Sequence, residues 1–184
     1  MRPAALPLAR DRRLTIIGAV GFAAALAAAS HVALPLPGTP VPVTLQPLVV
    51  VLAGLWLGPV SGAASMLLYI AAGAAGLPVF APTLPTVGVA RLLGPTGGYI
   101  LAYPLAAWLS GTVAARGGGF ARRVLAAAVG IAMVHLGGIA QLVALTGSVT
   151  TALTLGSLPF AAFDAVKAVV AAGLAPRRGE RARG

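Results

Sequence analysis

Long apolar stretches, separated by short breaks rich in glycine and proline, dominate the pattern of the chain. Residues 14–90 contain no Asp, Glu, Lys or Arg. Such a stretch cannot form a water-facing surface, whereas about 20 consecutive apolar residues suffice for a helix to cross the hydrocarbon core of a bilayer, roughly 30 Å thick. The pattern therefore predicts an all-α integral membrane protein.

Hydropathy and the Gly/Pro breaks divide the chain into six predicted transmembrane helices, which form one bundle within residues 14–175. The expected ranges are 14–34, 44–57, 60–76, 96–115, 124–145 and 158–174. The second range is too short to cross the bilayer at about 1.5 Å per residue, so we expect it to start earlier, to tilt or to be sheltered by its neighbours. Gly58 and Pro59 predict a tight break between the second and third helices.

Composition and charge narrow the class of protein. Charged residues make up 9% of the chain, against about 25% in soluble domains, which excludes an ordinary soluble enzyme. The net charge of +10 would suggest nucleic acid as a partner. However, 11 of the 13 basic residues lie in the segments 2–13, 116–123 and 177–183, each beside an apolar stretch. The other two are Arg91 and Lys167.

Basic segments of this kind mark cytoplasmic loops under the positive-inside rule. With six helices, all three segments fall on the same side of the membrane. The loops expected on the opposite side carry only Arg91 and are residues 35–43, 77–94 and 146–157. The sequence therefore predicts a basic cytoplasmic N-terminal segment over residues 1–13 and a basic cytoplasmic tail over residues 176–184, rather than a nucleic-acid interface.

Asp164 and Lys167 lie within the last apolar stretch, three residues apart and hence on one face of a helix. This spacing places Lys167 near the membrane midplane, where a charge costs at least about 2.5–3.5 kcal/mol. One interpretation is an ion pair that only pins the bundle. The other is a ligand or ion site that faces a protected polar interior.

Arg91 directly precedes a glycine-rich segment in which Thr96 is expected to cap the fourth helix. An arginine beside a helix N-terminus suits a carboxylate ligand, although an interfacial arginine can also snorkel to water. Thr44 and Gln46 begin the second helix, and the Gln amide suits an amide or ureido group. A glutamine at a helix start can also be merely solvated.

The aromatic residues have two possible roles, because they line a pocket or belong to interfacial belts; they are Tyr69, Tyr99, Tyr103, Trp56 and Trp108. His31 and His135 lie far apart in sequence, so we interpret them as polar packing and predict no metal site. Ala23 and Ala27 allow another helix to approach closely, although so alanine-rich a chain contains such spacing by composition alone.

The sequence lacks the motifs of several enzyme classes. Its single lysine follows Val166, so the chain has no Gly-Lys-Ser/Thr phosphate loop. It also lacks a serine nucleophile elbow and a His-Glu zinc motif, and with no cysteine it has no thiol nucleophile or thiolate metal site. We therefore expect a non-enzymatic membrane protein without a cofactor.

Four segments, residues 41–46 (VPVTLQ), 77–80 (LPVF), 94–99 (GPTGGY) and 164–167 (DAVK), resemble signature segments of the BioY family. The members of this family are the biotin-binding S components of energy-coupling factor (ECF) transporters. The segment after Phe80 is proline-rich here, where many members carry glycines.

The resemblance implies a six-helix protein of the prokaryotic cytoplasmic membrane that captures biotin, its transported substrate, from the outer side with high affinity. It also implies a transmembrane coupling (T) protein and two cytoplasmic ATPase subunits as partners. It places Asp164, Lys167 and Arg91 in the biotin site. The residues themselves allow the same interpretation, because Gln46, Thr44, Tyr99 and Thr96 lie at the expected outer helix ends and can converge with these charges on one pocket.

Other functions remain open at this point. An S component for a different small vitamin would share the scaffold. A self-sufficient secondary transporter would use Asp164 as its proton carrier, and a purely structural membrane protein would bind no ligand.

Overall fold

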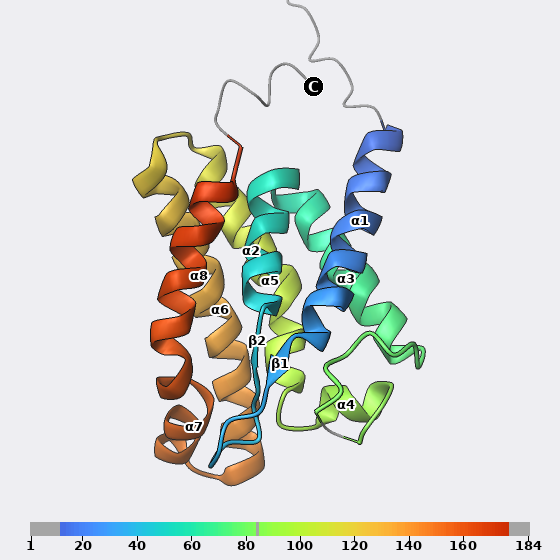
Figure 1. The fold of residues 1–184 in the computed structure, drawn as a ribbon, viewed down its shortest axis with the longest axis vertical. Coiled ribbons are helices and arrows are strands. Elements are labelled where there is room, and N and C mark those ends of the chain that lie inside the picture. Colours follow the sequence, from blue (N-terminus) through green and yellow to red (C-terminus); the bar gives the residue numbers. More distant parts are fainter. Residues whose placement is uncertain (1–11, 84, 177–184) are drawn as a thin grey trace, which may run out of the picture.

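A computed structural model describes residues 12–83 and 85–176, which fold into a bundle of helices (Figure 1). The elements in chain order are α1 (Arg12–His31), β1 (Ala33–Leu34), β2 (Val43–Thr44), α2 (Gln46–Leu57), α3 (Pro59–Ala74), α4 (Val89–Leu93), α5 (Gly97–Ala115), α6 (Phe120–Thr146), α7 (Val149–Gly156), the 3-10 helix η1 (Leu158–Phe160) and α8 (Ala161–Leu174). Most of the predicted N-terminal segment and of the predicted tail lies outside the described residues.

Helix α5 lies at the centre of the bundle, where it packs against α2, α3 and α6. The contact with α6 is close because glycines face each other across it. A Cβ atom on Gly98 would lie 2.2 Å from the carbonyl oxygen of Gly137, so neither backbone could come this near with a larger residue at position 98. This close packing holds the N-terminal end of α5 firmly against α6.

The break between α2 and α3 follows the prediction. Helix α2 ends at Leu57 and α3 begins at Pro59, joined by Gly58 with φ of 83° and ψ of 178°, a conformation open essentially only to glycine. Helix α2 has 12 residues, too few to cross a bilayer alone. The side chains of Val50 and Leu55 are fully buried. Neighbouring helices therefore shelter α2, which is one of the three arrangements expected for so short a helix.

The surface of the bundle suits a lipid environment. In the described part of the chain, four helical stretches are long and apolar enough to cross a membrane: Arg12–His31, Gly97–Ala115, Phe120–Thr146 and Val149–Leu174. Helices α2 and α3 are shorter and also apolar. Large apolar side chains such as Ile17, Val60 and Val166 are exposed. The predicted all-helical membrane architecture is confirmed, whereas the number of crossings and their orientation stay predictions.

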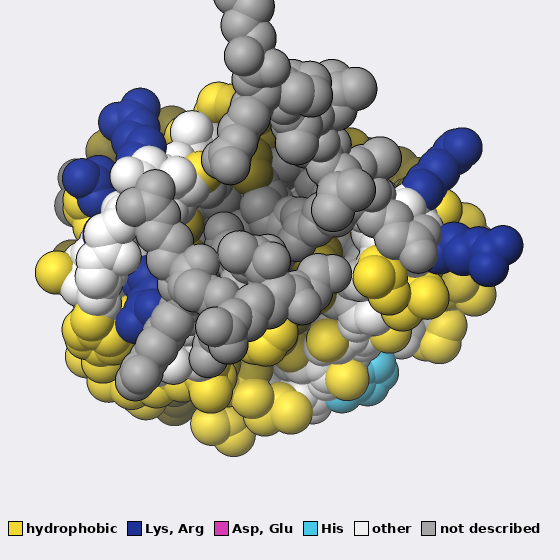
Figure 2. Space-filling view, turned by 90° about the horizontal axis from the view of Figure 1, so that it is seen from above, with side chains coloured by type: hydrophobic (Ala, Val, Ile, Leu, Met, Phe, Trp, Pro, Cys, Tyr) yellow, Lys and Arg dark blue, Asp and Glu magenta, His cyan; other side chains and the backbone are white. Residues whose placement is uncertain are grey.

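The two ends of the bundle differ in character. Both described chain ends lie at one end, together with the α5–α6 connection, and the β1–β2 hairpin, α4 and α7 lie at the other (Figure 1). Seen from the end that holds the chain ends, Lys and Arg side chains stand at the edge among hydrophobic ones (Figure 2). The described basic residues at this end are Arg12, Arg13, Arg116, Arg122 and Arg123.

Several predicted boundaries need correction. The first helix ends at His31, because residues 33–34 pair antiparallel with residues 43–44 in a proline-rich hairpin. Helix α6 begins at Phe120 and so includes Arg122 and Arg123, which were expected in a loop. Residues 149–156, also expected in a loop, form α7, whose first turn is capped by the Ser148 side chain accepting from the Thr151 amide.

Candidate ligand-binding site

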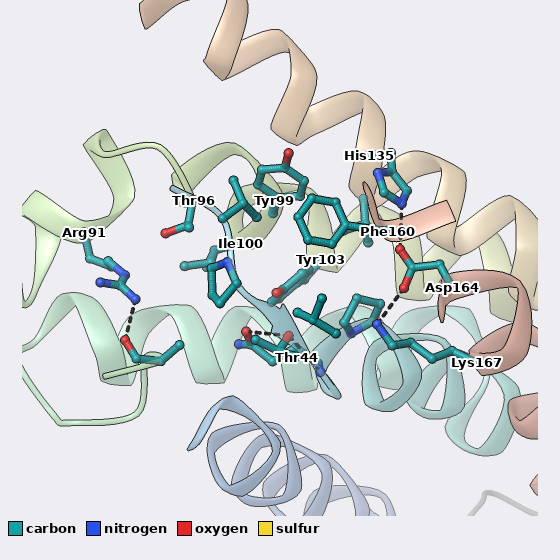
Figure 3. A pocket seen from close by; sticks show the side chains of 17 residues that line it. Thr44, Arg91, Thr96, Tyr99, Ile100, Tyr103, His135, Phe160, Asp164 and Lys167 are labelled. Atoms are coloured by element: carbon teal, nitrogen blue, oxygen red, sulfur yellow. Dashed lines mark hydrogen bonds and ion pairs between the residues drawn. The ribbon is translucent and has the colours of Figure 1, made fainter. Parts of the chain in front are cut away.

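A cavity lies toward the end of the bundle that carries the hairpin, α4 and α7. Its lining combines segments far apart in the sequence, namely the hairpin, the start of α2, α4, the start of α5, the middle of α6, η1 and α8. The space that these segments surround is about 590 Å³, including the part open to solvent. Figure 3 shows the side chains around it.

The cavity brings together every residue that the sequence predicted for substrate binding: Thr44, Gln46, Arg91, Thr96, Tyr99, Asp164 and Lys167. Residues that the prediction did not assign to it also line it, including His135, Ile100 and Phe160. Tyr103 also lines the cavity, whereas Trp56 and Trp108 are not among its lining residues and are 46% and 42% exposed.

One end of the cavity is built around the carboxylate of Asp164. Its Oδ1 accepts a hydrogen bond from Lys167 Nζ at 2.6 Å, and its Oδ2 lies 2.7 Å from His135 Nε2. All three side chains are at most 15% exposed. Because each carboxylate oxygen has two acceptor positions, Asp164 retains acceptor capacity for a ligand after binding both neighbours.

His135, which the sequence led us to interpret as polar packing, makes a polar contact with the Asp164 carboxylate and also lines the cavity. It lies on α6, 29 residues before Asp164 on α8, and Figure 3 shows its ring directed at that carboxylate. No spacing rule links residues on two separate helices, so the sequence alone gave no signal for the pair. In the part of the chain that the structure describes, no three His, Cys, Asp or Glu residues gather as metal ligands.

The other end of the cavity contains Arg91, on the short helix α4. Arg91 is 1% exposed, which excludes the snorkelling interpretation. Its Nη2 donates to the carbonyl oxygen of Ala81, and burial lowers the pKa of the guanidinium from its ordinary value. Arginine nevertheless stays protonated in proteins, so this end of the cavity is cationic.

Thr96 lies between Arg91 and the start of α5 but does not cap the helix as predicted, because its side chain makes no capping bond. Its Oγ1 is buried and has no hydrogen-bond partner among the described residues. A buried hydroxyl in this state costs stability unless a ligand or water binds it. Thr96 therefore offers the cavity an unused donor and acceptor near Arg91.

Thr44 and Gln46 supply polar groups between the two ends. The Thr44 hydroxyl donates to Gln46 Oε1 at 3.3 Å, and Gln46 Nε2 donates to the Tyr69 hydroxyl at 2.8 Å. Gln46 is 5% exposed, so it is not merely solvated. Its amide retains one N–H donor and one acceptor position that these two bonds do not use.

The middle of the cavity is mostly apolar. The Tyr99 hydroxyl donates to the carbonyl oxygen of Gly156 at 2.6 Å, so this residue offers the cavity mainly its ring. Ile100, Tyr103 and Phe160 add further aromatic and aliphatic surface. The site thus consists of two charged ends separated by an apolar middle, which suits an elongated ligand with polar groups at both ends.

Ala23 and Ala27 lie away from this site on α1. Ala23 is buried in the hydrophobic core of the chain, and Ala27 packs against that core. Packing within the chain therefore accounts for both small residues, and their contact with a partner helix stays a prediction.

Comparisons with known proteins give a consistent result. Residues 5–183 match the BioY family. The probable biotin transporter BioY of Pyrococcus horikoshii is 44% identical over 75% of this chain and 80% of its own length. The biotin transporter BioY of Thermotoga maritima is 35% identical over 85% of this chain and 90% of its own length.

A solved structure has the same fold. It is the crystal structure of the S-component for biotin from an ECF-type ABC transporter, which superposes with a TM-score of 0.83 at 24% sequence identity. The match covers 97% of this chain and 96% of the other.

Proposed function

The chain belongs to the BioY family, and we propose that it captures biotin for uptake across the membrane as the S component of an ECF-type transporter. The observation that carries this proposal is the arrangement of the cavity. Asp164 and Lys167 lie at one end, Arg91 lies at the other, and aromatic and aliphatic side chains line the space between them.

Biotin has a complementary arrangement of groups. Its ureido ring presents two N–H donors and one carbonyl acceptor, its sulfur-containing ring and alkyl chain are apolar, and its far end is a carboxylate. We place the ureido ring at Asp164 and Lys167, where the carboxylate accepts from the N–H groups and the ammonium donates to the carbonyl oxygen.

In this orientation the biotin carboxylate lies at Arg91 and Thr96, because a cation and a buried hydroxyl suit an anion and Asp164 would repel it. Tyr99, Tyr103 and Ile100 pack against the apolar part of the ligand. Gln46, with Thr44 beside it, contributes its remaining amide donor and acceptor to the polar groups of biotin.

The placement of charges supports an orientation in the membrane. The described basic residues of the predicted cytoplasmic segments lie at the end opposite the cavity, so the positive-inside rule favours an outward-facing cavity and cytoplasmic termini. We propose six membrane crossings by α1, α2, α3, α5, α6 and the combined α7–η1–α8 segment. Residues 14–175 would then form the biotin-binding domain, between basic cytoplasmic segments 1–13 and 176–184.

The remaining proposals concern partners and energy. A transmembrane T protein and two cytoplasmic ATPase subunits would drive uptake, because the chain itself has no phosphate-binding loop. The location would be the cytoplasmic membrane of a prokaryote, and biotin would be a substrate rather than a cofactor.

Equilibrium binding of radiolabelled biotin to the detergent-purified chain tests the proposal. We expect saturable binding in the absence of nucleotide, abolished by excess unlabelled biotin. The absence of bound biotin would contradict the assignment. Uptake in cells with and without the coupling subunits then distinguishes an S component from a self-sufficient proton-coupled transporter.

A pair of single cysteine variants tests the orientation. Thr86→Cys lies on the cavity side and Gly119→Cys on the opposite side, and both positions are exposed. An impermeant thiol reagent applied to intact cells should label position 86 and not position 119, and the reverse pattern would overturn the topology.

A further inference from the structure

We propose that His135 is a positioning residue for ligand recognition, which holds the Asp164 carboxylate in the orientation that the ligand needs. This inference rests on the proposed function, because the ligand concerned is biotin. It adds a residue on α6 to a site whose charged groups come from α4 and α8.

The first argument is the way in which Asp164 is held. It is the only acidic residue between positions 12 and 176, and its two oxygens contact different helices. Lys167 holds Oδ1 from the same helix, and His135 holds Oδ2 from α6 at 2.7 Å. The χ2 angle of an aspartate has a broad distribution. With Lys167 as its only partner, the carboxylate plane could therefore still rotate while Oδ1 kept its hydrogen bond. The second contact fixes the plane and therefore the direction of the remaining lone pairs.

The imidazole ring is itself held in place. The Tyr99 ring packs against it edge-on, with centroids 6.5 Å apart and an interplanar angle of 77°. Tyr99 is fixed in turn by the hydrogen bond from its hydroxyl to the carbonyl oxygen of Gly156. A chain of contacts therefore runs from the α7 backbone through Tyr99 and His135 to Asp164, and every side chain in it lines the cavity.

The second argument is the hydrogen bonding of the imidazole. The carboxylate beside Nε2 favours the form of the ring that carries a proton on Nε2. Nδ1 is buried and has no hydrogen-bond partner among the described residues, which is unfavourable for a residue that only fills space. Leucine would fill the same space without this cost. The benefit of histidine at this position therefore lies in its contact with Asp164.

Glutamine and asparagine form a matched pair for testing this role. A glutamine side chain can place its amide N–H close to the position of imidazole Nε2, whereas asparagine has the same chemistry but is one methylene too short. Leucine preserves the volume and removes the donor. His31→Leu is the control, because His31 is exposed on α1 and does not line the cavity.

The experiment measures biotin affinity and melting temperature for the full-length wild type and these four variants in detergent. We expect His135→Gln to bind within about threefold of wild type and His135→Asn and His135→Leu to bind about 10- to 50-fold more weakly, as for the loss of a hydrogen bond to a charged group. His31→Leu should match wild type, and all five proteins should melt within a few degrees of one another.

Any other result shows whether the positioning role of His135 or the proposed function is wrong. Wild-type affinity in His135→Asn or His135→Leu would overturn the positioning role alone. So would equal weakening in all three His135 variants, because a purely structural contact gives no rescue by glutamine. Loss of folding in the asparagine and leucine variants would likewise show a structural role. A wild-type protein that binds no biotin would overturn the proposed function and this inference with it.

Discussion

At one end of the cavity, Asp164 and Lys167 lie on α8 and His135 lies on α6, and both Lys167 and His135 contact the Asp164 carboxylate directly. At the other end, Arg91 lies on a helix of five residues and donates to a backbone carbonyl of the preceding loop. The first end is therefore positioned by the packing of α6 against α8, and the second depends on the conformation of the loop residues 77–83, which include Ala81.

That loop is anchored to the bundle at two adjacent residues. The carbonyl oxygen of Val79 accepts hydrogen bonds from Ser30 and Tyr69 at 2.7 and 3.0 Å. The Phe80 ring fills a notch over Gly73, where a Cβ atom would lie 2.1 Å from a ring carbon. The comparison teaches that two ends of one site can be positioned by different kinds of contact. It predicts that packing changes beneath the loop affect the Arg91 end more than the Asp164 end.

The largest effect is expected from Asp164→Leu. This change leaves Lys167, whose side chain is 10% exposed, as a buried charge without its carboxylate, which costs about 3–5 kcal/mol of stability. Biotin affinity should fall more than about 100-fold, as two hydrogen bonds to a charged group are lost. Adding Lys167→Met should restore much of the melting temperature and none of the binding. Near-wild-type affinity in the double variant would show that the pair only pins the bundle.

Arg91→Leu should have the next largest effect. It should also distinguish the role of the Arg91 end of the cavity from that of the Asp164 end. The loss of a charge-assisted hydrogen bond predicts about 1.5–3 kcal/mol weaker biotin binding. The methyl ester of biotin lacks the negative charge, so its binding should respond much less to this variant. Asp164→Leu should weaken both ligands equally. An equal response of biotin and its ester to Arg91→Leu would place the carboxylate elsewhere.

Gly73→Ala tests the anchoring of the loop, with Gly21→Ala as the matched control. Both residues lie in apolar helices, but a Cβ atom on Gly21 meets nothing within 4 Å. Overpacking against Phe80 should cost about 1–3 kcal/mol of stability, and biotin binding should weaken a few-fold through the Arg91 end. Thermal melts and biotin titrations measure both effects. Equal behaviour of the two variants would show that the notch does not position the loop.

Thr96→Val should give the smallest effect. The hydroxyl has no hydrogen-bond partner among the described residues, so its removal should leave stability unchanged or slightly raised. If Thr96 binds the biotin carboxylate, affinity should fall by about 0.5–1.5 kcal/mol. A destabilised protein with unchanged affinity would assign the hydroxyl a structural role.

Much of the fold was predictable because bilayer physics leaves strong patterns in a sequence. Long apolar stretches predicted the helices, and Gly58 with Pro59 predicted the break between α2 and α3. The β1–β2 hairpin and α7 were missed because their formation depends on local pairing and capping in segments where prolines and short length conceal any periodicity. The hairpin region supplies residues 41–44 to the cavity wall, so the shape of this part of the cavity did not follow from the sequence patterns.

The sequence predicted several of the residues that line the cavity, but not the contacts between them. Asp164 and Lys167 follow from their spacing on one helix, and Arg91 from its isolation on the side away from the basic segments. His135 was missed because only the packing of α6 against α8 brings it to the carboxylate. The free hydroxyl of Thr96 was missed because a threonine at a helix start ordinarily caps it.

The structure of the purified chain with bound biotin would test the central claim most directly. Our account predicts biotin inside the cavity, with its ureido nitrogens within about 3.2 Å of the Asp164 carboxylate oxygens and its carboxylate at Arg91. Biotin bound outside this cavity, or with its carboxylate at Asp164 and Lys167, would contradict it.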